Sequence, residues 1–219
     1  MAVSSPVFDS EQRGQQAPLL VVGLGNPGME YVWTPHNAGF MAIDRIANQN
    51  GASVTNRRGM ALTGITEIGG RSILLARPET FMNRSGLSVK ALLEEFYPDD
   101  PDSGRRNLLV LYDELDLPLG TIKIRERGSP AGHNGARSIT SSLGTEVWLR
   151  IRIGVGQKLS AEAIAAGAKR PGGSNYLLSP MRKADLLLLD EALDRVAQAV
   201  RQIALEGPAA AMNEWNRSA

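Results

Sequence analysis

The sequence contains no cysteine, which excludes disulfide bridges, thiolate metal sites and a cysteine nucleophile. It also has no apolar run that approaches the ~20 residues needed to span a membrane. Neither sign of charge is in excess, because 24 Lys and Arg residues oppose 23 Asp and Glu residues and the formal net charge is +1. The overall charge therefore does not indicate a nucleic-acid-binding protein, and any basic surface must be local.

The remaining composition is that of a soluble protein long enough for one well-buried domain. Hydrophobic residues make up 42% and charged residues 21% of the 219 residues. Residues 1–17 lack the apolar core of a signal peptide, and we expect them to form a disordered tail. We expect the folded domain at 18–205 and a C-terminal tail at 206–219, and the absence of cysteine fits a cytoplasmic protein.

Apolar strands alternate with amphipathic helices along the chain. The predicted strands cover residues 19–23, 60–68, 72–76, 107–112, 121–125 and 147–155. The predicted helices cover residues 39–51, 87–96, 135–143 and 184–205, with a polar loop at 98–106 and an ambiguous segment at 156–175. This order indicates an α/β fold, a single domain with a twisted, mostly parallel (mixed) sheet flanked by helices on both faces.

A glycine-rich turn follows the first strand and matches the G-x-G-x-x-G pattern of dinucleotide sites from Gly23 to Gly28. That pattern requires a helix to begin at the turn, and Pro27 together with Pro35 argues against such a helix. The acidic residue expected about 20 positions further on is also missing, because Asp44 falls inside a predicted helix. We therefore favour a tight strand-exit turn that exposes Asn26 over a dinucleotide site.

One of only two histidines, His36, lies in the loop after this turn. Its unperturbed pKa of about 6.5 suits a group that exchanges protons near neutral pH. Asp113 is the first polar residue after the buried strand 107–112, and a carboxylate there can fix the tautomer of a histidine by accepting a hydrogen bond. A metal site with Glu114 and Asp116, or a solvated turn, are the alternatives for this acid.

Amide side chains follow two further elements. Asn83, between a strand and a helix, either presents its amide to a substrate or caps the helix. His133 is expected to cap the helix that follows it. As an alternative for this segment, the Asn134 amide and the helix N-terminus bind an anion or a carbonyl. The sequence has no G-x-S-x-G elbow and no Walker motif. A histidine with an acid and several amides suits a water molecule activated to attack an acyl ester.

Two predicted strands carry basic residues at alternate positions. Lys123 and Arg125 alternate with isoleucines, and so do Arg150 and Arg152. Each stripe alone is most simply a solvated face of the sheet. Together, in a nearly neutral chain, they suggest a local phosphate-binding surface.

Several of these segments, in this order and spacing, resemble bacterial-type peptidyl-tRNA hydrolases. The first block is Gly-Leu-Gly-Asn-Pro-Gly-x-x-Tyr-x-x-Thr-x-His-Asn-x-Gly-Phe at 23–40. The others are Pro-x-Thr-Phe-Met-Asn-x-Ser-Gly at 78–86, Asp-Glu-Leu-Asp-Leu-Pro-x-Gly at 113–120, Gly-His-Asn-Gly at 132–135 and Arg-Ile-Gly-Val-Gly at 152–156. The pattern departs from the family at Pro35, at Tyr112, in the loop 127–132 and over 157–178.

The resemblance implies cleavage of the ester between a peptide and the terminal ribose of tRNA, which recycles tRNA from prematurely released peptidyl-tRNA. It implies that His36 is the general base, that Asp113 holds it in the basic form and that Asn26 helps to reject unblocked aminoacyl-tRNA. By the same resemblance, the substrate would contact Asn26, Asn83, Asn134, Tyr31, Phe81 and Met82, and tRNA phosphates would contact Lys123, Arg125 and Arg152. It further implies no metal, no cofactor, no membrane contact and a monomer without an obligate protein partner. The rival hypotheses are an RNA-binding protein without activity and a dinucleotide-dependent enzyme.

Overall fold

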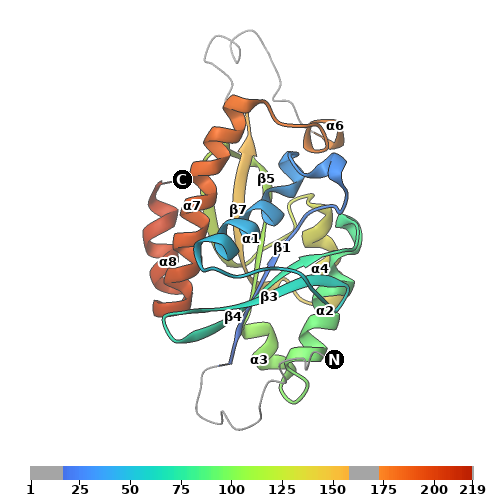
Figure 1. The fold of residues 1–219 in the computed structure, drawn as a ribbon, viewed down its shortest axis with the longest axis vertical. Coiled ribbons are helices and arrows are strands. Elements are labelled where there is room, and N and C mark those ends of the chain that lie inside the picture. Colours follow the sequence, from blue (N-terminus) through green and yellow to red (C-terminus); the bar gives the residue numbers. More distant parts are fainter. Residues whose placement is uncertain (1–16, 158–172, 219) are drawn as a thin grey trace.

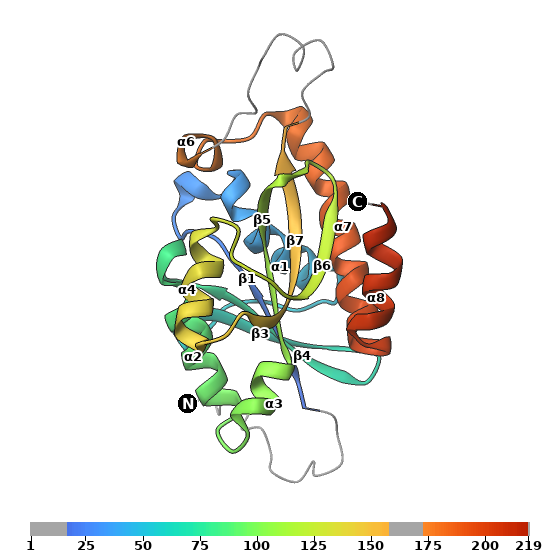
Figure 2. The same ribbon diagram turned by 180° about the vertical axis from the view of Figure 1, so that it is seen from behind.

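A seven-stranded sheet lies between two layers of helices in the computed structural model, which describes residues 17–157 and 173–218 (Figures 1 and 2). The strand order is β2-β3-β4-β1-β5-β7-β6. The central strands β4, β1, β5 and β7 are parallel, and the pairs β2–β3, β3–β4 and β6–β7 are antiparallel. The strands are β1 (Leu19–Gly23), β2 (Asn56–Arg58), β3 (Ala61–Ile68), β4 (Arg71–Pro78), β5 (Leu108–Pro118), β6 (Ile122–Arg127) and β7 (Val147–Gly156). The predicted α/β class with a mixed sheet is confirmed.

Helices cover both faces of this sheet, as the sequence predicted (Figures 1 and 2). One face packs against α1 (Ala38–Gln49), α7 (Lys183–Glu206) and α8 (Pro208–Trp215), and the other against α2 (Ser85–Phe96) and α4 (Asn134–Leu143). The continuous apolar run of β1 is buried along its whole length because it feeds both hydrophobic cores. None of the described helices is long and apolar enough to cross a membrane.

Two segments expected to be irregular form helices, and the strand predicted at 107–112 continues to Pro118, so that Asp113 lies within β5 rather than after it. The loop predicted at 98–106 contains a short helix, α3 (Pro101–Arg106), whose N-cap Asp100 accepts a hydrogen bond from the Ser103 backbone N–H at 2.8 Å. Within 206–219, expected to be a tail, α8 packs against α7, and its Ala211 is fully buried. The tail predicted at 1–17 lies outside the described residues except for Ala17. Most of the ambiguous segment at 156–175 also lies outside them, and the short helix α6 (Ser174–Leu177) begins near its end.

The carboxyl ends of the neighbouring parallel strands β1 and β5 open at the same edge of the sheet. The turn after β1 leads into two 3₁₀ helices, η1 (Met29–Tyr31) and η2 (Pro35–Asn37), and α1 begins only after them. Helix α1 can start close against the end of β1 because Gly39 has no side chain. A Cβ at this position would lie 2.4 Å from the backbone of Leu24. The helix that a dinucleotide site needs at the glycine-rich turn is therefore not formed.

Candidate active site

His36 is held in η2 by the proline before it. Thr34 is extended, with φ −94° and ψ 152°, which is the conformation that a following proline favours. Pro35 then occupies the first helical position, where its fixed φ and missing N–H carry no cost. The departure from the family at Pro35 thus fits the local backbone, and it leaves the His36 ring buried at the edge of the sheet.

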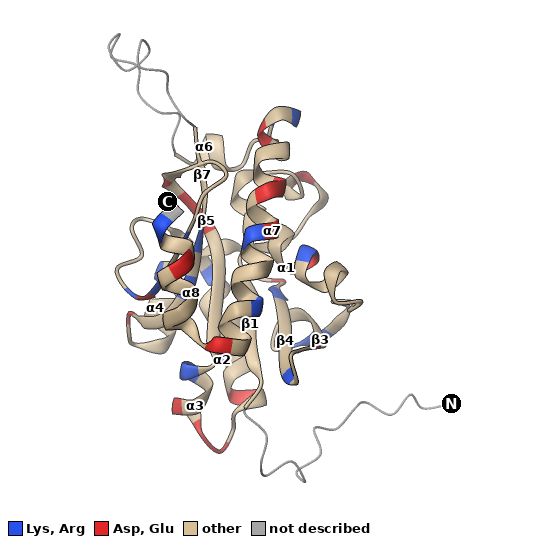
Figure 3. Ribbon diagram, turned by 90° about the vertical axis from the view of Figure 1, so that its left-hand side faces the viewer, with Lys and Arg blue, Asp and Glu red and all other residues tan. Residues whose placement is uncertain are grey.

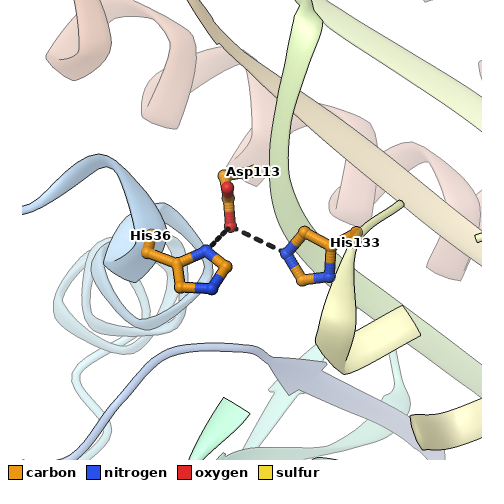
Figure 4. Close-up of side chains that lie close together, drawn as sticks. All are labelled: His36, Asp113 and His133. Atoms are coloured by element: carbon orange, nitrogen blue, oxygen red, sulfur yellow. Dashed lines mark hydrogen bonds and ion pairs between the residues drawn. The ribbon is translucent and has the colours of Figure 1, made fainter. Parts of the chain in front are cut away.

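His36 forms a hydrogen bond with the fully buried Asp113, as Figure 4 shows. The distance from His36 Nδ1 to Asp113 Oδ1 is 2.9 Å. Because an ionised carboxylate can only accept, Nδ1 carries the proton and Nε2, on the side of the ring away from Asp113, keeps its lone pair. The structure therefore brings together the pair that the sequence suggested, in the tautomer that a general base at Nε2 requires.

The second histidine reaches the same carboxylate oxygen. His133 Nε2 lies 2.9 Å from Asp113 Oδ1 (Figure 4), and His133 Nδ1 accepts the backbone N–H of Ala136 at 3.1 Å as the N-cap of α4. The predicted capping role is confirmed, and the contact with Asp113 was missed. The other oxygen, Asp113 Oδ2, is buried without a hydrogen-bond partner among the residues that the structure describes.

Burial and charge act in opposite directions on this cluster. Burial alone would lower the pKa of His36, but the charge of Asp113 and the hydrogen bond to it outweigh burial and raise that pKa above 6.5. Burial alone would raise the pKa of Asp113, but the two histidines beside it hold that pKa well below the usual 3.8. Asp113 is therefore ionised at every pH at which His36 can act as a base.

A second network fixes Asn26 in the turn after β1. Asn37 accepts the Asn26 backbone N–H at 2.8 Å and donates its Nδ2 to the Asn26 carbonyl at 3.0 Å. The Asn26 Oδ1 in turn accepts the backbone N–H of Met82 at 2.8 Å, which leaves its Nδ2 as a donor. Asn37 directly follows His36 in the sequence, but no role was predicted for it. It connects the loop of the base to the turn that carries the amide.

These side chains line one cavity of about 730 Å³. Its lining includes every residue predicted for the catalytic or substrate-binding roles: Asn26, Tyr31, His36, Phe81, Met82, Asn83, Asp113 and Asn134. The alternative capping role of Asn83 is wrong, because the residue before α2 is Arg84 and no side chain caps that helix. Phe81 is 58% exposed on the wall, so an apolar contact surface lies beside the polar cluster.

The basic residues predicted to bind phosphate divide into two kinds. Lys123 and Arg125 lie on the face of β6 opposite the buried isoleucines. Arg152 instead forms an ion pair with Glu114, and Arg150 is buried with its guanidinium 3.4 Å from the centre of the Trp148 ring. Figure 3 shows basic and acidic residues interspersed on α7 and α8 rather than gathered by sign.

One group of the described residues has the composition of a metal site. His36, Asp113 and His133 offer ligand atoms within 4.8 Å of one another. The nitrogens that face Asp113 carry protons, however, since His133 Nδ1 already accepts from Ala136 and the His36 proton is donated to the carboxylate. The cluster therefore fits proton transfer better than metal binding. In the alternative set, Glu114 is occupied by Arg152 and by the Asp116 backbone N–H.

Comparison with known proteins agrees with this geometry. The family model described as peptidyl-tRNA hydrolase matches residues 20–219. Peptidyl-tRNA hydrolase of Acidobacterium capsulatum is 58% identical over 90% of this chain and 95% of its own, and that of Koribacter versatilis is 50% identical over 90% and 92%. The crystal structure of peptidyl-tRNA hydrolase from Acinetobacter baumannii aligns with a TM-score of 0.75 at 33% identity, covering 92% of this chain and 95% of that one.

Proposed function

The chain belongs to the peptidyl-tRNA hydrolase family, and we propose that it cleaves the ester between peptide and tRNA with a water molecule that His36 activates. The observation that carries the mechanism is the bond of 2.9 Å from His36 Nδ1 to Asp113, because it leaves Nε2 unprotonated in the cavity. The substrate class rests on the family.

The reaction that this geometry supports is a hydrolysis in two proton transfers. His36 Nε2 takes a proton from water while the water oxygen attacks the ester carbonyl carbon. Asp113 stabilises the imidazolium that forms. The carbon–oxygen bond to the ribose then breaks, and the ribose oxygen takes the proton from Nε2. The products are free tRNA and a peptide with a new carboxyl group.

The amides around the base would position the substrate. Asn26 keeps its Nδ2 as a donor because its oxygen is bonded to Met82, so we propose that it binds a carbonyl of the peptide and favours blocked over free aminoacyl-tRNA. Asn83 and Asn134 line the same cavity and would hold the ester and the peptide end. Tyr31, Phe81 and Met82 would pack against the peptide.

The tRNA body would contact the basic residues of the edge strand. Lys123 and Arg125 have exposed or half-exposed side chains and no ion pair within the described part of the chain. Arg152 lies directly opposite Lys123 in the register of β6 and β7. Its Nε and one terminal nitrogen are bonded to Glu114, so only its remaining nitrogen would contact a phosphate. We further propose that the protein acts as a monomer in the cytoplasm.

The test compares wild type with His36→Ala on N-acetyl-aminoacyl-tRNA and on free aminoacyl-tRNA. We expect wild type to cleave the blocked substrate and spare the free one, and His36→Ala to lose cleavage while still binding tRNA. Equal rates for the two proteins on the blocked substrate would overturn the mechanism. Binding without cleavage by wild type would instead favour the RNA-binding alternative.

A further inference from the structure

We propose that His133 is a positioning residue that keeps the general base His36 unprotonated by sharing the one oxygen of Asp113 on which His36 depends. The inference rests on the proposed function of His36. Both histidines approach Asp113 Oδ1 at 2.9 Å, and Oδ2 has no partner among the described residues. The oxygen Oδ1 therefore accepts hydrogen bonds from both imidazole rings at once.

The tautomer of His133 follows from its other contact. Its Nδ1 accepts the Ala136 backbone N–H and therefore has no proton of its own, so Nε2 carries the proton and donates it to Asp113. A second proton on His133 would sit at Nδ1, where the cap of α4 would be lost. The ring also lies against Tyr112, with ring centres 4.7 Å apart. Helix α4 thus fixes the tautomer of His133, with Nε2 as the donor to Asp113.

A second donor on Oδ1 weakens Asp113 as a partner for a charged His36. A hydrogen bond to an anion lowers its proton affinity, and here it also reduces the stabilisation that Asp113 gives to the His36 imidazolium. This matters because Asp113 raises the pKa of His36, whereas a base must be unprotonated at the working pH. His133 would limit that rise while holding the carboxylate in line with His36.

The other titratable or charged groups around the cluster come from several elements. The cavity wall contributes Tyr31 from η1, Arg84 from η3 (Met82–Arg84) and Glu114 from β5. Glu114 forms an ion pair with Arg152, so its carboxylate is directed to that guanidinium. None of these three groups hydrogen-bonds to the His36 ring within the described part of the chain, where the partner of that ring is Asp113.

Two substitutions separate the capping role of His133 from its contact with Asp113. His133→Asn retains a good N-cap side chain but is too short to reach Asp113. His133→Gln can place its amide N–H near the position of Nε2 but caps poorly. The chain has two histidines, so His133→Asn leaves His36 as the sole imidazole, and its proton NMR titration reads the His36 pKa directly.

We expect His133→Asn to raise the His36 pKa, and with it the acidic limb of kcat/KM, by about one pH unit. The loss of activity should be about tenfold at acidic pH and smaller at alkaline pH. His133→Gln should lower the melting temperature yet keep the acidic limb close to that of wild type. An unshifted His36 titration in His133→Asn, or equal shifts in both variants, would overturn the proposal. The NMR titration does not depend on turnover, so a failure of the proposed function would show separately in His36→Ala.

Discussion

Replacing Asp113 by asparagine removes the charge beside His36 with almost no change in volume. The side chain is 1% exposed and lies 2.9 Å from His36, so solvent does not replace the lost interaction. A hydrogen bond to a charged group contributes about 1.5–3 kcal/mol. At about 1.36 kcal/mol per factor of ten, the lost stabilisation of the imidazolium corresponds to roughly a 10- to 150-fold fall in kcat. If the new amide turns its NH₂ toward His36, the tautomer is also wrong, and the fall approaches the roughly 10⁴-fold seen in a serine-protease triad.

The same substitution has a second, directional signature. In wild type the pKa of His36 lies above 6.5, so kcat/KM should rise with pH through an acidic limb above that value. In Asp113→Asn the raising influence is gone and burial, which lowers the pKa, remains. The acidic limb should therefore move below 6.5.

The assay is the pH dependence of kcat/KM on N-acetyl-aminoacyl-tRNA. Asp116→Asn is the matched control, because it makes the same charge change at an exposed position on the same strand. We expect the control to follow the wild-type profile. A wild-type rate in Asp113→Asn, or an acidic limb that moves upward, would refute the assignment of Asp113 as the partner of the base.

Two further predictions concern the basic residues. Lys123→Ala and Arg125→Ala should each lower the slope of log KM against log salt by about one, because each removes a phosphate contact; an unchanged slope would mean that the β6 stripe is only solvated. Arg152→Ala should destabilise the fold by about 3 kcal/mol in urea denaturation, because it leaves Glu114, which is 5% exposed, buried and unpaired. Adding Glu114→Gln should recover part of that loss, and no recovery would contradict the ion-pair explanation.

The sequence predicted the elements whose apolar pattern is long and regular. The strand β1 and the helix α7 lie where they were expected. All residues of β1 are buried and therefore form an apolar run, and α7 buries one face and therefore has apolar residues at helical spacing. Helix α3 was missed because it is only six residues long and polar, so its N-cap rather than an apolar face defines it. Helix α8 was missed because an eight-residue, alanine-rich segment carries little periodic signal, and its packing against α7 became visible only in three dimensions.

The candidate site shows the same division between local and distant information. A histidine in the loop after β1 and an acid on the neighbouring parallel strand are predictable neighbours, since Asp113 lies on β5 just beyond the last residue that pairs with β1. The distance from His133 to Asp113 depends on where the loop 128–133 delivers the start of α4, and no residue pattern encodes that. The role of Asn37 was missed for a different reason. Its two hydrogen bonds are to the backbone of Asn26, and backbone groups are the same whatever residue stands at that position.

The scarcity of histidine acquires its meaning only from the geometry. Two histidines separated by 97 positions meet at one carboxylate oxygen, but the contacts at their other ring nitrogens differ. His133 uses its second nitrogen to accept a backbone N–H, and this fixes it as a donor to Asp113. His36 has its second nitrogen at the cavity, where it can take a proton from water. The same side chain and the same partner thus give two roles, and the difference between them is set by whether a helix N-terminus or a substrate cavity faces the remaining nitrogen.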